Sequence, residues 1–189
     1  MVKPDTWIQK KSRLEEMISP FSKGQARKGV ISYGVSSYGY DVRLGNKLRV
    51  CTRTSYTLLN PKTSNFDNLF ESYEVDRGEP FDIPSHSFAL GYSLEYFKIP
   101  RDILVICFGK STYARCGVIV NVTPLEPEWE GNITIEISNT SPHPARIYPG
   151  EGICQLIFLQ ANEVCAKSYA DKKGKYQGQK GITLPKVSR

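Results

Sequence analysis

The feature that most constrains the fold is a strict alternation of apolar and polar residues over residues 133–138. Isoleucines occupy positions 133, 135 and 137, and Thr134, Glu136 and Ser138 lie between them. In an extended strand the isoleucines share one face and the polar residues share the other. A glutamate in this setting is costly unless its face is wet, hydrogen-bonded or catalytic. Glu136 is therefore the leading candidate for an acid with a perturbed pKa, although a solvent-facing or ion-paired glutamate fits the strand pattern equally well.

Short alternating segments recur along the chain and are separated by Gly, Pro, Asn and Asp. The predicted strands are Tyr40–Leu44, Lys47–Val50, Phe88–Tyr92, Ile103–Phe108, Val118–Thr123, Ile133–Asn139, Ala145–Tyr148 and Cys154–Leu159. Many short strands at this spacing are typical of a sandwich or barrel and not of a doubly wound sheet. A length of 189 residues suits a single domain over residues 1–189 with a sizeable core.

Helical patterns are confined to two places. The N-terminus predicts a helix that is capped by Asp5 or Thr6 and ended by Pro20 and Gly24. Its expected apolar side consists of Trp7, Ile8, Leu14, Met17 and Ile18. Residues 60–80 are polar and turn-rich, which predicts a long surface excursion with one short helix at Asn65–Phe70.

The distribution of charges and cysteines indicates which kinds of binding partner and which cellular compartment to expect. Residues 161–189 hold seven of the Lys and Arg residues against two acidic ones, and in residues 172–181 the charges alternate with glycines. This pattern favours a mobile flap closing on a small anion over a rigid basic face for nucleic acid. No apolar run approaches the ~20 residues that cross a bilayer, so we expect no membrane partner. The odd, widely spaced set of five cysteines indicates reduced thiols and a cytoplasmic protein.

The turn Gly109-Lys110-Ser111 offers groups that suit a polyphosphate. It is not a P-loop, because the first glycine of that motif is missing upstream of Gly109. The residues up to Arg115 nonetheless supply hydroxyls, backbone amides and a guanidinium, although an ordinary turn also explains them. The two histidines, His86 and His143, lie in turn sequences and are expected to be exposed. The chain has no Cys-x-x-Cys pair and no His-x-Glu motif, so the zinc centre of base deaminases is not available.

Several separated motifs, in order along nearly the whole chain, carry a family resemblance. The matching segments are residues 37–45, 109–117, 121–123, 127–131, 133–139, 149–156 and 174–181. Together they closely resemble the dCTP deaminases, the zinc-independent deaminases of the dUTPase superfamily. The superfamily's usual Gly-Arg-Ser is Gly-Lys-Ser here, so Lys110 keeps the charge and loses the bidentate fork.

The resemblance implies a fold, an assembly and a reaction. The fold would be mainly β, a distorted jelly-roll or dUTPase-like β-barrel with an N-terminal helix, assembled as a homotrimer with active sites at subunit interfaces. The reaction would be hydrolysis of dCTP to dUTP and ammonia, which feeds dUMP and dTTP synthesis. Mg²⁺ would bind through the triphosphate, with no zinc. Residues 165–189 would form a flexible lid over the nucleotide, and feedback by dTTP stays open.

The resemblance also implies roles for individual residues. Glu136 matches the proton-shuttling glutamate, and Ser111 and Arg115 match residues beside the attacked ring carbon. The matching nucleotide contacts are Lys110, Ser111, Thr112, Tyr113, Ala114, Arg115, Thr134, Ile135, Glu136, Gln155, Tyr169, Lys175 and Gln179. We expect desolvation to raise the pKa of Glu136 and the Arg115 charge to lower it. Ser111 and a carbonyl near Thr123 are expected to hold the water.

Two other functions fit parts of the sequence. In dUTPases an aspartate at the position of Glu126 activates water, so a bifunctional enzyme that carries dCTP through to dUMP is an alternative. Those enzymes have an apolar residue at the position of Glu136, which favours deamination here. A regulatory nucleotide- or nucleic-acid-binding module would explain the basic tail but leaves Glu136 unexplained, since an acid beside a phosphate site weakens anion binding.

Overall fold

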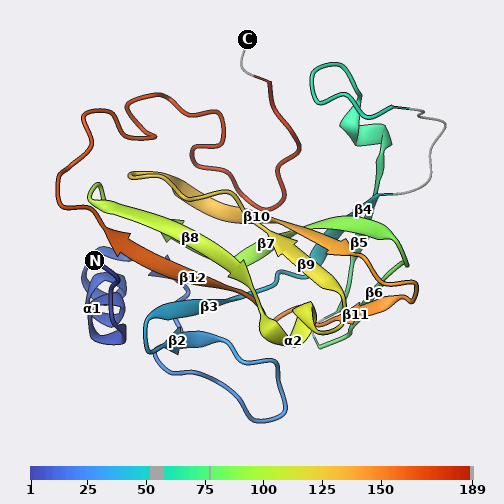
Figure 1. The fold of residues 1–189 in the computed structure, drawn as a ribbon, viewed down its shortest axis with the longest axis horizontal. Helices are drawn as coiled ribbons and strands as arrows, with labels where there is room; N and C mark the ends of the chain where they lie inside the picture. The colour runs from blue at the N-terminus through green and yellow to red at the C-terminus, as the bar shows by residue number, and fades with distance from the viewer. Residues whose placement is uncertain (52–57, 77, 188–189) are drawn as a thin grey trace.

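Antiparallel sheets form the centre of the molecule in the computed structural model, which describes residues 1–51, 58–76 and 78–187 (Figure 1). The largest sheet has the order β5-β4-β7-β10-β9, with β1 also paired to β7. A second sheet has the order β2-β3-β12-β8, and β11 pairs with β6. The strands are β1 (Ile18–Ser19), β2 (Gly34–Ser36), β3 (Gly39–Arg43), β4 (Lys47–Cys51), β5 (Phe70–Glu74), β6 (Phe81–Ile83), β7 (Ser87–Lys98), β8 (Ile103–Gly109), β9 (Val118–Asn121), β10 (Glu130–Asn139), β11 (Ala145–Ile147) and β12 (Gly152–Gln160).

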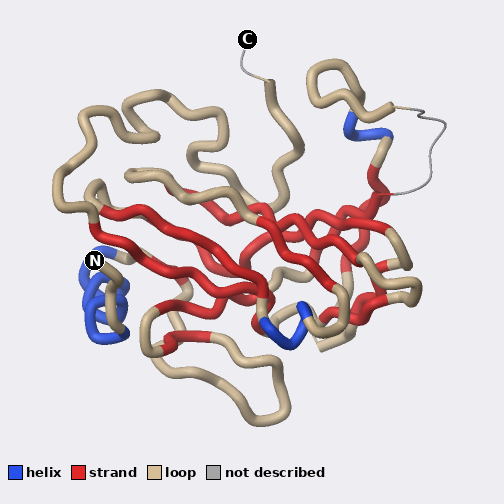
Figure 2. The backbone as a smooth tube through the Cα atoms, in the orientation of Figure 1, coloured by secondary structure: helices blue, strands red, loops and turns tan. Residues whose placement is uncertain are grey.

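Each of the eight predicted strands is present, and the fold is mainly β. The helical elements are α1 (Asp5–Glu15), η1 (Phe66–Asn68) and α2 (Ser111–Ala114), which lie around the strands (Figure 2). The strands do not form a closed barrel within the described ranges, so this part of the expected fold is wrong. The two large sheets end in separate edge strands, and the bridge that joins β7 to the end of β3 is the isolated pair Leu44 with Ser93.

The N-terminal helix is shorter than predicted. Its N-cap position is Pro4, so the prediction of Asp5 or Thr6 as the cap is wrong. Pro4 is extended, and its carbonyl accepts hydrogen bonds from the backbone N–H groups of Trp7 and Ile8, so the helix begins without a side-chain cap. The chain leaves the helix at Glu16 with a φ of 51°, well before Pro20. Leu14 is exposed, whereas Met17 and Ile18 are buried as extended chain beside β7.

The expected surface excursion at residues 60–80 contributes to the main sheet. Its strand β5 pairs with β4 from Lys47↔Glu74 to Cys51↔Phe70. Phe70 is buried, and its ring lies edge-on to Phe88 at 5.5 Å between centroids. The short helix is the 3₁₀ turn η1, in which the Asn65 side chain accepts a hydrogen bond from the backbone N–H of Asp67. Burial of an aromatic residue explains why a largely polar segment joins the sheet.

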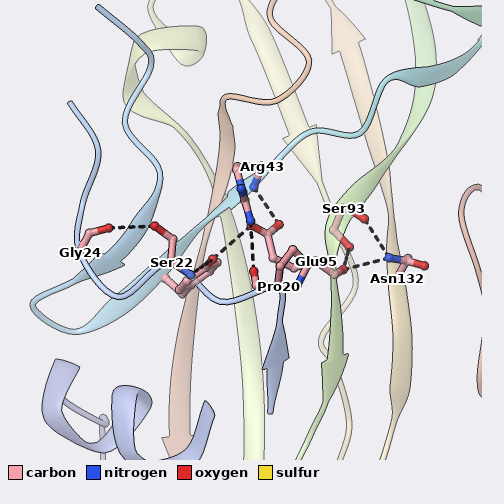
Figure 3. A network of polar contacts seen from close by, with 8 residues as sticks. Pro20, Ser22, Gly24, Arg43, Ser93, Glu95 and Asn132 are labelled. Carbon is pink, nitrogen blue, oxygen red and sulfur yellow. Dashed lines mark hydrogen bonds and ion pairs between the residues drawn. The ribbon is translucent and has the colours of Figure 1, made fainter. Parts of the chain in front are cut away.

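A charged cluster that the sequence did not predict lies inside the fold (Figure 3). Glu95 on β7 is fully buried and pairs with Arg43, whose Nε lies 2.7 Å from Oε1. Tyr40 donates its hydroxyl proton to the same oxygen at 3.1 Å. Desolvation raises the pKa of Glu95, and the guanidinium opposes the rise. Arg43 also donates to the carbonyl of Pro20, so the cluster ties the N-terminal segment to both large sheets.

The two histidines and the C-terminal segment lie outside the helices and strands. His86 and His143 are exposed in a turn and a bend, as predicted. No helix in the described ranges has the length and apolar character needed to cross a bilayer. The C-terminal segment, red in Figure 1, leaves β12 and returns along β10, where Gln179 forms a parallel bridge with Gly131.

Candidate active site

Glu136 lies near the middle of β10, and the predicted alternation is confirmed along this strand. The three isoleucines at 133, 135 and 137 are at most 1% exposed, and the polar residues between them are half-buried on the opposite face. Glu136 is paired with Leu90 of β7 on one side and with Asn121 of β9 on the other. Neighbours on both sides of a central strand fix the position of the carboxylate within the sheet.

The environment of Glu136 favours its protonated form. Desolvation by burial raises the pKa of Glu136 to about 7. The Nδ2 of Asn121, 3.4 Å from Oε2, opposes the rise. The predicted upward shift is thus confirmed, but Arg115 is not among the groups that lower the pKa within this chain. A carboxyl group with a pKa near neutrality can both accept and donate a proton at physiological pH.

A cavity of about 380 Å³ opens over this face of β10. Thr134 and Glu136 supply its polar side, and Phe66, Phe88 and Leu90 are among its apolar walls. Glu126 lies at the same cavity and forms an ion pair with Lys172 of the tail. A cavity of this size with apolar walls and few polar groups has the character of a small-molecule site.

The C-terminal tail closes part of this cavity. Tyr169, Tyr176, Gln179, Thr183 and Pro185 are its tail residues at the cavity. The indole N–H of Trp129 donates to the carbonyl of Tyr176 at 3.1 Å, and the N–H of Thr183 donates to Oγ1 of Thr134 at 3.0 Å. The predicted contact residues Tyr169 and Gln179 therefore lie beside Thr134 and Glu136. Lys175 is exposed and faces the ring of Tyr176 at 5.1 Å.

The turn predicted to bind phosphate does not lie at this cavity. Residues 110–115 do not line the cavity. The Lys110 ammonium group lies 2.8 Å from both Asp41 Oδ2 and Ser32 Oγ, so its charge is paired with a buried carboxylate. Ser111 and Arg115 are exposed, and the Arg115 guanidinium donates to the carbonyl of Ser111 at 3.0 Å.

The other residues around the turn divide between the core and the surface. Tyr113 is buried, and its hydroxyl accepts a hydrogen bond from the N–H of Tyr148, so its side chain is not available to a ligand. Thr112 and Ala114 are exposed. Gln155 on β12 lies opposite Asp41 of β3 and donates to Ser36 Oγ at 3.0 Å. The predicted site residues thus fall into two groups, one on β10 with the tail and one at the β8–α2 turn with β12.

Two contributors to the site were not assigned roles from the sequence. Asn121 and Asp41 both lie within quoted motifs, but their partners Glu136 and Lys110 are far away in the chain. Pairing of this kind depends on strand register, which local patterns do not reveal. No group of three or more His, Cys, Asp or Glu side chains in the described residues is placed to hold a metal ion.

Comparison with known proteins shows the family of the chain. The family model described as dCTP deaminase-like matches residues 2–161. The dCTP deaminase of Nautilia profundicola is 61% identical over 189 residues, which cover 100% of this chain and 99% of that protein. The dCTP deaminase of Paramagnetospirillum magneticum is 57% identical over 98% of this chain and 99% of that protein.

A solved structure supports the fold. The crystal structure of 2′-deoxycytidine 5′-triphosphate deaminase from Agrobacterium tumefaciens aligns with a TM-score of 0.61 at 19% identity. The alignment covers 83% of this chain and 47% of that one. Taken with the full-length matches to curated relatives and the acid on β10, these similarities show that the chain belongs to the dCTP deaminase-like family.

Proposed function

We propose that this protein hydrolyses dCTP to dUTP and ammonia, with Glu136 as the general base and acid. The observation that carries the proposal is a half-buried carboxylate with a pKa of about 7 at a cavity of nucleoside size. Family membership supports the choice of substrate. The product would feed the synthesis of dUMP and dTTP.

Glu136 performs each proton transfer in turn. Its carboxylate takes a proton from water, and the hydroxide forms a bond to C4 of cytosine while N3 receives that proton. The regenerated carboxylate then takes a second proton from the new C4 hydroxyl and gives it to the amino group. The C4–N bond breaks, the carbonyl of uracil forms and ammonia leaves. A pKa near the working pH makes both directions of transfer accessible.

We also propose that the site is completed by another copy of the chain. Ser111 on α2 and Arg115 directly after it are exposed and do not line the cavity of their own chain. The strands that flank α2 in the chain, β8 and β9, expose Leu104, Phe108 and Ile119, of which Phe108 is 57% and Ile119 56% exposed. Exposed apolar side chains grouped in this way are typical of an interaction surface. A homotrimer of distorted jelly-roll subunits would bring Ser111 and Arg115 of one chain to Glu136 of the next.

The cofactor and the setting of the reaction belong to the same proposal. Mg²⁺ would enter with the triphosphate, as is usual for a hard cation that keeps several waters and binds substrate phosphates. Lys175 and the backbone amides of the β8–α2 turn are available to the phosphates, with the tail as the lid. The odd, scattered set of cysteines supports a cytoplasmic location. Neither nucleic acid nor membrane is needed as a partner, and dTTP is a candidate feedback inhibitor.

The test follows the products formed from dCTP and Mg²⁺. Ammonia with dUTP supports the proposal, whereas dUMP with pyrophosphate indicates the bifunctional alternative. Glu136→Gln should retain nucleotide binding and release no ammonia, and Glu163→Gln, at an exposed position in the tail, serves as the control. Near-normal turnover by Glu136→Gln contradicts the assigned role.

A mixing experiment tests the shared site. The Ser111→Ala and Glu136→Gln proteins should each be inactive alone. If each site takes its glutamate and its serine from different chains, unfolding and refolding an equal mixture restores about one quarter of the sites. If the mixture reassembles but recovers no activity, both residues of each site come from the same chain.

A further inference from the structure

Asn132 on β10 stabilises an irregularity in the central sheet. The pairing of β10 with β7 shifts register between Asn132 and Thr134. The Asn132 amide nitrogen donates to the carbonyls of Ser93 at 3.0 Å and of Glu95 at 3.1 Å (Figure 3). The hydroxyl of Ser93 accepts a hydrogen bond from the N–H of Ile133 at 2.7 Å. These side chains satisfy the backbone groups that a bulge leaves without ladder partners.

The remaining polar atoms of Asn132 bind the tail. Its backbone N–H donates to the carbonyl of Gln179 at 3.0 Å, and its own carbonyl accepts from the Gln179 side chain at 2.7 Å. Its Oδ1 accepts a hydrogen bond from the N–H of Gly181 at 3.2 Å. The side-chain amide of Asn132 thus forms hydrogen bonds to β7 through its nitrogen and to the tail through its oxygen.

The neighbouring glycine makes this approach of the tail possible. Gly131 has a φ of 149°, and a Cβ at this position would lie 2.9 Å from the backbone oxygen of Gln179. Thr134, on the other side of Asn132, accepts a hydrogen bond from Thr183. The tail therefore follows β10 in a defined path from Gly131 to Thr134. Thr134 lies two residues before Glu136 on the same face of the strand.

We propose that Asn132 is a positioning residue that holds the C-terminal tail in its docked path over the cavity. The expected change in KM rests on the proposed deamination. The expected change in tail docking rests on the hydrogen bonds alone. The docked tail supplies Tyr169, Tyr176 and Gln179 to the cavity. Asn132 itself does not line the cavity, so it acts through the tail.

Loss of the Asn132 side chain should change KM more than kcat. When only a fraction of the molecules has the tail docked, the apparent affinity for substrate falls by that fraction. Saturating substrate restores the docked form, so kcat stays close to its original value. Loss of a single hydrogen bond to the tail lowers the ratio of docked to undocked tail by about fivefold, which is the upper limit of the increase in KM.

The experiment compares Asn132→Ala with Asn139→Ala. Asn139 lies at the other end of β10, where its amide donates to the carbonyls of Ile83, Pro84 and His143 and its oxygen accepts from Ser141. It is therefore a chemical match whose four side-chain hydrogen bonds all go to residues outside the tail. Trypsin cleavage after Lys175 and Lys180 measures tail docking in the protein without nucleotide, and dCTP kinetics measure KM and kcat.

Asn132→Ala should speed tail cleavage and raise KM by two factors whose product is about fivefold, with kcat within about twofold. Asn139→Ala should lower thermal stability and leave tail cleavage and KM unchanged. Equal tail cleavage and equal KM in the two variants overturn the inference. If the original protein releases no ammonia from dCTP, the proposed function fails, and the cleavage rates alone then decide whether Asn132 anchors the tail.

A second pair of variants covers the case in which Asn132→Ala does not fold. Gly131→Ala keeps the Asn132 amide but displaces Gln179, whereas Gly150→Ala places a methyl group at another positive-φ glycine with open space around it. Faster tail cleavage in Gly131→Ala than in Gly150→Ala supports the docked path along β10. Equal cleavage contradicts it.

Discussion

Replacing Glu136 with glutamine measures how strongly the cavity desolvates this carboxylate. The pKa of Glu136 is raised from 4.5 to about 7 in the folded protein, with desolvation as the largest cause. Between these values the folded protein binds a proton that the unfolded chain has released. The free energy of unfolding therefore falls as the pH rises through this window. Glutamine does not titrate in this range, so residue 136 no longer makes the free energy of unfolding depend on pH in the variant.

The size of the effect follows from the shift. One pKa unit corresponds to about 1.4 kcal/mol, which sets a ceiling of about 3 kcal/mol for Glu136. The side chain is half-buried and its cavity is open to water, so screening reduces the expected effect to about 1–2 kcal/mol. The stability of Glu136→Gln relative to the original protein should grow by this amount from about pH 4 to about pH 8.

Urea unfolding at the two pH values measures the difference. Both proteins need the same concentration, because any assembly makes the apparent stability depend on it. Glu163→Gln, at an exposed position outside the cavity, is the control and should show no comparable growth. A stability difference between Glu136→Gln and the original protein that stays constant across the pH range refutes the reasoning.

Three further predictions concern the core, the buried cluster and the metal. Ile135→Ala removes a fully buried side chain and should cost about 2–5 kcal/mol in urea unfolding, and a cost below 1 kcal/mol contradicts the assigned burial. Tyr40→Phe removes the hydroxyl that donates to the buried Glu95 and should cost about 1–3 kcal/mol, with unchanged thermal stability as the contrary result. Chelation of Mg²⁺ by EDTA should lower ammonia release from dCTP, and excess Mg²⁺ should restore it. A zinc chelator, 1,10-phenanthroline, should leave the rate unchanged, and inhibition by it contradicts a zinc-independent reaction.

The strands were predictable because their signal is local. Alternation over a few residues located β10 and placed Glu136 opposite the buried isoleucines. The strands β2 and β6 span three residues each, too few for a pattern to show. The segment Phe70–Glu74 was predicted as a surface excursion because it is largely polar, but Phe70 is buried and the segment pairs with β4 along its whole length.

The site was predictable in its residue types but not in its long-range pairs. The pairing of Lys110 with Asp41 joins residues 69 positions apart and uses the charge that the turn sequence had assigned to a phosphate. Asn132 was not singled out, because nothing local distinguishes it from other polar residues of a strand. Its contacts depend on a register shift and on the path of a tail more than forty residues later in the chain.

The alternation along β10 also protects the strand from pairing incorrectly. A slip of one residue would turn every side chain to the opposite face, which would place the carboxylate of Glu136 among core side chains and turn the isoleucines toward the cavity. An unpaired charge in an apolar interior is far more costly than a lost apolar contact. The residue proposed to move protons in the reaction therefore also helps to select the correct strand register as the protein folds.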